Sequence, residues 1–71
     1  MDIYSKPGTI VKFVEDDVTQ AQINWGSHDD PRGVLEVGKE YIIDRTEVHS
    51  QHTKVFLKGY DKKSFNSVWF K

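Results

Sequence analysis

Phe65-Asn66-Ser67-Val68-Trp69-Phe70 closes the chain and, with the hairpin before it, decides the predicted fold. Phe65 and Val68 are three residues apart, so one turn of 3₁₀ helix would place them on the same side. Val68 and Phe70 are two residues apart, so a strand at this point would direct both side chains inward and Trp69 outward. The stretch therefore predicts a short helical turn that leads into a last strand.

The residues before it have the pattern of a β-hairpin. Residues 35–48 begin with an apolar-charged-apolar alternation, break at Gly38, and resume with aromatic and β-branched residues at positions 41–43. Residues 53–58 alternate between an apolar face and a lysine-bearing face. Residues 49–52 are polar and short enough to link antiparallel neighbours.

The first half of the chain adds two further strands to the prediction. Residues 9–14 are rich in β-branched residues, and residues 18–25 alternate, with Trp25 on the more apolar face. Residues 26–33 are a loop by composition, and residues 1–8 are expected to form a loosely held lead-in that ends at a Pro-Gly pair. With the hairpin and the closing strand this makes five strands, which is the size of a small β-barrel.

Length and composition predict a single small domain that spans residues 1–71. The chain has no cysteine, which fits a reducing cytoplasm, and no apolar run near the roughly 18 residues that a membrane span requires. We therefore expect a cytoplasmic protein with no membrane contact and no leader peptide. The predicted core consists of Ile23, Trp25, Leu35, Val37, Tyr41, Ile43, Val55, Leu57, Phe65, Val68 and Phe70.

Two motifs carry a resemblance to known proteins. The pattern Leu-x-Val-Gly-Lys-x-Tyr at 35–41 is similar to the diverging turn of a small SH3-like barrel, and residues 65–70 are similar to its 3₁₀ turn and closing strand. More narrowly, residues 34–70 resemble short uncharacterised proteins of phages and prophages of Gram-positive bacteria, through Val-His-Ser-x-His-Thr and Phe-Asn-Ser-Val. The resemblance implies an all-β, five-stranded SH3-like barrel in a bacterial host cell, and it implies no activity.

The first strand departs from one branch of that fold. Peptide-binding members of the class carry an Ala-Leu-Tyr-Asp-Tyr-like first strand that supplies aromatic rungs for proline-rich ligands. This chain has Gly-Thr-Ile-Val-Lys-Phe at positions 8–13 instead. The resemblance therefore does not extend to proline-rich ligands.

Histidines are the first candidates for chemistry. His28 precedes two aspartates, and His49 and His52 have an H-x-x-H spacing. Zinc sites use three or four ligands at fixed geometry, and a hairpin turn does not direct these two rings to one point. Ser50 lacks the context of an activated nucleophile. We therefore expect no cofactor and no catalysis, with a metal site or an enzyme around the three histidines as the minority alternative.

Charge is divided unevenly along the chain. Residues 1–52 carry five basic and ten acidic side chains, whereas residues 53–71 carry five basic and one acidic. Lysines beside aromatic residues suit nucleic acid, although lysines also protect sheet edges as a solvated face. The candidate nucleic-acid-binding residues are Lys54, Lys58, Lys62 and Lys63.

Exposed aromatic side chains are the candidates for binding a protein. Trp69 alternates away from its apolar neighbours and is expected to be at least partly exposed, with Tyr60 nearby, and such residues are enriched at interface hot spots. The leading hypothesis is a non-catalytic binding module, a phage- or prophage-type accessory protein that acts through protein contacts. The alternative is weak nucleic-acid binding by the lysine-rich segment. The sequence specifies neither the partner nor an oligomeric state.

Overall fold

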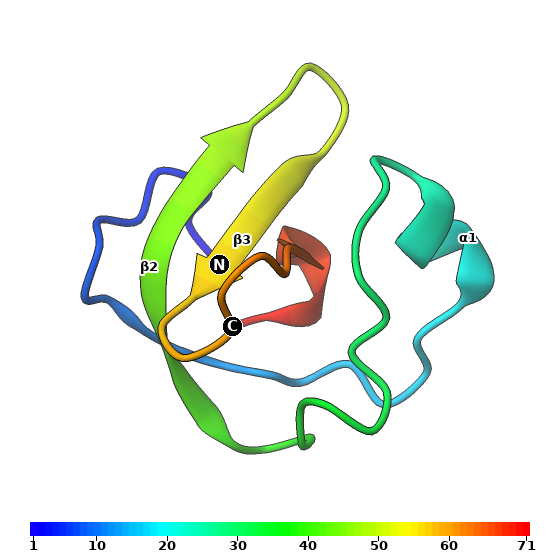
Figure 1. Cartoon of the computed structure of the whole chain (residues 1–71), viewed down its shortest axis with the longest axis horizontal. Helices are drawn as coiled ribbons and strands as arrows, with labels where there is room; N and C mark the ends of the chain where they lie inside the picture. The colour runs from blue at the N-terminus through cyan, green and yellow to red at the C-terminus, as the bar shows by residue number, and fades with distance from the viewer.

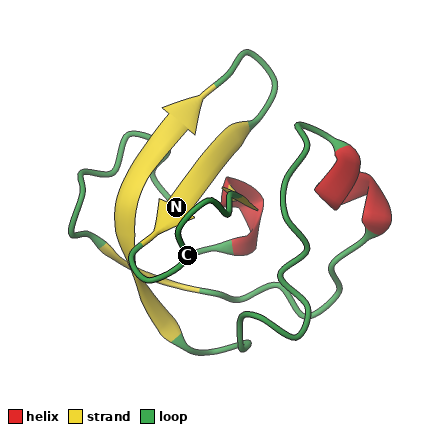
Figure 2. Ribbon diagram, in the orientation of Figure 1, coloured by secondary structure: helices red, strands yellow, loops and turns green.

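A four-stranded antiparallel sheet in the order β1-β2-β3-β4 organises the chain (Figure 1). The computed structural model describes all 71 residues, and most of its regular structure is strand (Figure 2). One α-helix and one 3₁₀ helix complete it, and η1 lies between the sheet and α1 in this view. The elements are β1 (Ile10–Lys12), α1 (Gln20–Asn24), β2 (Glu40–Val48), β3 (Thr53–Leu57), β4 (Phe65–Asn66) and η1 (Ser67–Trp69).

The β2–β3 hairpin confirms the sequence-based prediction. Ile43 pairs with Leu57 and Val48 with Thr53, with a shift of register after Ile43. The side chains of β3 alternate between buried and half-buried, because successive side chains of a strand point to opposite faces. The connection at 49–52 is closed by a 2.8 Å hydrogen bond from the His49 backbone nitrogen to the His52 carbonyl oxygen.

The end of the chain returns to lie beside β1. Phe13 and Phe70 form an isolated antiparallel bridge outside the four-stranded sheet. Lys12 and Lys71 exchange two backbone hydrogen bonds of 2.9 Å each, and the Val14 backbone nitrogen donates to the Trp69 carbonyl oxygen at 2.8 Å. The first strand therefore contacts β2 on one side and the chain terminus on the other.

The lead-in at residues 1–8 is attached at three points. The amino group of Met1 donates to the Phe70 carbonyl oxygen at 3.1 Å, and the Thr46 hydroxyl donates to the Ile3 carbonyl oxygen at 3.0 Å. The Gly8 backbone nitrogen donates to the carbonyl oxygen of Ile43 at 2.8 Å. These bonds hold the segment against β2 and the closing residues.

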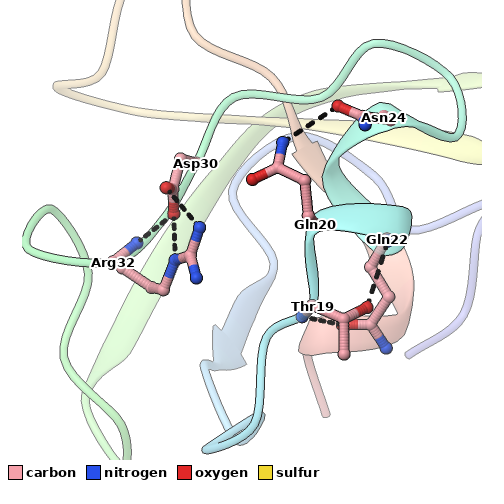
Figure 3. A network of polar contacts seen from close by, with 6 residues as sticks. All are labelled: Thr19, Gln20, Gln22, Asn24, Asp30 and Arg32. Carbon is pink, nitrogen blue, oxygen red and sulfur yellow. Dashed lines mark hydrogen bonds and ion pairs between the residues drawn. The ribbon is translucent and has the colours of Figure 1, made fainter.

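The prediction of a strand over residues 18–25 is wrong, because α1 occupies this segment. Thr19 and Gln22 form a capping box: each backbone nitrogen donates to the other's side-chain oxygen, at 3.2 Å in both cases (Figure 3). Gln20 donates to Asn24 one turn later at 3.0 Å. Glutamine and alanine also favour helix, so the local signals outweigh the short alternation.

None of the helices has the length or apolarity to cross a membrane.

The hydrophobic core confirms eight of the predicted positions. Its members are Val11, Phe13, Ile23, Leu35, Tyr41, Ile43, Val55, Leu57, Phe65, Trp69 and Phe70. The prediction of burial is wrong for three residues: Trp25, Val37 and Val68 are 58%, 56% and 62% exposed. Trp25 leaves the core because a helical turn, unlike a strand, does not place it on the face of Ile23.

The closing stretch contains the predicted short helical turn, but the predicted strand from residue 67 and the predicted side-chain directions are wrong. Residues 67–69 form η1 rather than a strand, and Asn66 begins the turn by accepting a 3.2 Å hydrogen bond from the Val68 backbone nitrogen. Trp69 is fully buried, whereas Val68 faces out. The larger apolar ring gains more from burial, and its Nε1 donates to Gln22 Oε1 at 3.1 Å.

Candidate functional site

The two aromatic residues predicted as protein anchors do not form a common exposed surface. Trp69 is fully buried, so the expectation that it is exposed is wrong. Tyr60 is half-buried, with its ring centroid 5.8 Å from that of Tyr41 and 6.3 Å from that of Phe65. Both side chains therefore serve packing in this structure.

The exposed tryptophan is Trp25, at the end of α1. It borders a depression of about 380 Å³ that the β2–β3 loop and η1 also line. Val68 lies on the same depression, and both residues also border a second, more open hollow over α1 of about 400 Å³. We call this surface the Trp25 face; it consists of Ile3, Trp25, residues 49–53 and residues 66–68.

The loop at 49–52 is fixed against the turn that follows α1. Trp25 Nε1 donates to the Gln51 carbonyl oxygen at 3.3 Å. His52 packs so closely on Gly26 that a Cβ at this glycine would lie 2.5 Å from His52 Cδ2. Gly26 also has a φ of +95°, which residues with a side chain rarely adopt. Glycine is therefore needed here for two reasons, the backbone conformation and the lack of space for a Cβ. The wall of the Trp25 face is therefore held in place by contacts between distant segments.

The structure brings the three histidines together, with His49 and His52 in this wall and His28 packed against His52. The rings of His49 and His52 stack with centroids 4.6 Å apart, and His28 meets His52 edge to face at 5.6 Å. His28 also lies 6.0 Å from Trp69, with an edge-to-face geometry. The rings therefore pack on one another, and no group of three or more His, Cys, Asp or Glu side chains is placed to hold a metal ion.

His28 is the unusual member of this cluster. It is 5% exposed, and neither ring nitrogen has a hydrogen-bond partner within the chain. Burial away from water lowers its pKa to about 4, and His52 and Lys54 act in the same direction because a second positive charge beside them is unfavourable. A buried polar atom without a partner costs free energy, so this residue weakens the fold where α1 and the loop meet.

The Trp25 face carries no formal charge when its histidines are neutral. None of its ten residues is Asp, Glu, Lys or Arg, although 30% of the chain is charged. Its polar groups are hydroxyls, amides and imidazoles. Three of the polar residues in this lining are buried: Thr53, Asn66 and Ser67. The surface is therefore suited to an uncharged ligand with both apolar and hydrogen-bonding groups.

The candidate lysines are distributed along β3 and the loop after it. Lys54 is half-buried and pairs in register with Glu47 and Asn66. Four residues of strand, about 13 Å, separate Lys54 from Lys58. A small hollow of about 220 Å³ near Lys62 is also lined by two aspartates. Lys54 and Lys58 are therefore not adjacent along the chain, and Lys62 lies beside acidic side chains.

Trp25 and Val68 are surface residues, although the alternation pattern predicted both of them to lie in the core. The Thr-x-x-Gln pattern at 19–22 is typical of the start of a helix. A helix in place of the predicted strand would have removed the reason to place Trp25 in the core. The contact between His28 and the loop at 49–52 has no local signal, since more than twenty residues separate them.

No protein-family model, no curated protein and no solved structure matches this chain.

Proposed function

We propose that this protein is a non-catalytic binding module that docks on another protein through the Trp25 face. The observation that carries the proposal is an exposed tryptophan beside an exposed valine on a surface that the fold holds in place. Tryptophan is enriched among the residues that dominate binding energy at protein interfaces. The centre of such interfaces is also depleted in charge, as the Trp25 face is.

The chemistry of the Trp25 face favours one kind of occupant. A partner segment without charge loses no ion hydration there, whereas a phosphate backbone would find no cation on the face. The buried residues Thr53 and Ser67 bring hydroxyl groups that can bond the backbone of a peptide. The occupant we propose is an uncharged apolar segment of a partner protein that covers Trp25 and Val68.

The cellular setting, a bacterial host cell, and the assignment of the fold as an SH3-like barrel are part of the same proposal. The pairing of Lys12 with Lys71 and the Phe13–Phe70 bridge support a five-stranded, SH3-like barrel in which the last residues serve as the fifth strand. The resemblance of residues 34–70 to phage and prophage proteins supports an accessory protein in the cytoplasm of a bacterial host. Nucleic-acid binding by Lys54, Lys58, Lys62 and Lys63 is the competing function that the test must separate.

The test is capture from bacterial lysate with variants of the exposed apolar residues. Trp25→Ala and Val68→Asp should each abolish capture of a defined partner, and nuclease treatment should leave wild-type capture unchanged. Ile10→Ala is the matched control, because Ile10 is 60% exposed on β1 and lies outside the Trp25 face. Melting temperatures establish that each variant is folded.

Two results would reject the proposal. One is capture that survives both Trp25→Ala and Val68→Asp in folded protein. The other is capture that nuclease abolishes and that weakens steeply with salt, since binding that releases counterions from phosphates depends strongly on salt concentration. In the second case, alanine replacement of Lys62 and Lys63 should reduce the salt slope by roughly one unit for each lysine that contacts a phosphate.

A further inference from the structure

Another depression, of about 420 Å³, lies away from the Trp25 face, between the two legs of the long connection from β1 to β2. Its apolar part includes the buried Phe13 and Leu35 and the exposed Val37. The legs are tied together by backbone hydrogen bonds from Gly38 to the Phe13 carbonyl oxygen at 2.7 Å and from Phe13 to the Lys39 carbonyl oxygen at 3.1 Å. The depression is therefore a preformed groove with apolar walls.

Three acidic residues, Glu15, Asp16 and Asp17, line this groove. None of them forms an ion pair within the chain. The one cation that lines the groove is Arg32, which is already bound by both carboxylate oxygens of Asp30, at 2.9 and 2.8 Å (Figure 3). The groove therefore has uncompensated negative charge beside apolar side chains. We call it the acidic groove.

We propose that the acidic groove binds a segment of a partner protein in which lysine or arginine alternates with apolar side chains. The cations would pair with the carboxylates, and the apolar side chains would cover Val37 and the groove wall. Complementary charge of this kind selects the partner and accelerates its association. The Trp25 face has no Asp, Glu, Lys or Arg, so the two surfaces favour different ligands, and neither proposal depends on the other.

The probe is a labelled hexapeptide in which lysine alternates with leucine, with blocked ends, measured by fluorescence anisotropy at low salt. Its two counterparts replace every lysine with glutamate or every leucine with glycine. The lysine–leucine peptide should bind, more weakly as salt is raised, and both counterparts should bind at least several-fold more weakly. The glycine counterpart separates binding in the groove from attraction to negative charge alone.

The decisive variant is the double substitution Asp16→Asn and Asp17→Asn, which removes charge and keeps side-chain size. It should weaken peptide binding by about two- to thirty-fold, the range expected for two exposed ion pairs. Asp44→Asn with Asp61→Asn is the matched control, because both aspartates are exposed and lie outside the groove. This control should bind as the wild type does, and so should Trp25→Ala, which keeps the outcome separate from that of the Trp25 face.

Three results would overturn the proposal. The first is equal weakening in the control variant, and the second is equal binding of the lysine–leucine and lysine–glycine peptides. The third concerns a second copy of this chain, whose loop at 58–63 carries lysines. Dimerisation at low salt, seen by sedimentation and lost in a Lys62→Ala and Lys63→Ala variant, would identify the occupant as this chain itself.

Discussion

Acidification should destabilise the protein through His28. Its pKa falls from 6.5 to about 4 on folding, first because the ring is buried and then because His52 and Lys54 repel the added charge, while Asp29 opposes this in part. Between these two pH values the unfolded chain binds the proton and the folded chain does not. Stability is therefore unaffected by this group above about pH 6.5 and falls progressively as the pH is lowered towards 4.

The magnitude of this loss follows from the shift. The difference between a pKa of 6.5 in the unfolded chain and one of about 4 in the folded chain corresponds to about 3 kcal/mol once the pH lies below both values, at 1.36 kcal/mol per unit. Small domains are stabilised by only about 5–15 kcal/mol in total, so the loss should be easy to measure. The same proton would disturb the contact with His52 that helps to hold the loop at 49–52.

The assay is urea unfolding at a series of pH values between 7.5 and 4, followed by tryptophan fluorescence. His28→Phe is the informative variant, since it keeps an aromatic ring beside Trp69 and removes both unpaired nitrogens. It should be at least as stable as the wild type at pH 7, and more stable by about 3 kcal/mol at pH 4. A pH dependence that is unchanged in His28→Phe would refute the reasoning, and His49→Gln serves as the control that keeps His28.

Three further changes test the packing. Leu57→Ala, at a buried position of β3, should reduce the free energy of unfolding by about 2–5 kcal/mol in chemical denaturation, and a loss below 1 kcal/mol would contradict the core described here. Gly26→Ala should lower the melting temperature more than Gly33→Ala does, because both glycines have positive φ and only Gly26 lies against a side chain, that of His52. Equal decreases in the melting temperature of the two variants would contradict the steric role assigned to Gly26. Thr19→Ala should cost about 1 kcal/mol through loss of the helix cap, while Thr19→Ser should be nearly neutral in the same measurement.

The hairpin was predictable because its signals are local and agree with one another. Residues 53–57 alternate with a period of two, β-branched and aromatic residues fill β2, and a short polar connection joins the strands. Gly38, with a φ of +87°, marks the turn that leads into β2. Inward positions on these strands, such as Val55 and Leu57, were accordingly predicted correctly.

Alternation alone could not decide the segment at 18–25. Eight residues are too few to separate a period of two from a helical period when the apolar residues are sparse, and the capping signal from Thr19 and Gln22 favours helix. That choice also determined the candidate site. In a strand Trp25 would have shared the face of Ile23, whereas after α1 it lies at the surface.

Local patterns in the sequence specify the hairpin, the turns around it and most of the core, since backbone preference and side-chain alternation act over a few residues. The burial of Trp69 and the exposure of Val68 instead depend on long-range contacts, because Gln22 and His28, more than forty residues away, pack against η1. The burial of His28 also depends on distant segments, since its ring packs against His52 and Trp69. Burial depends on which segments meet in space, and no window of neighbouring residues contains that information.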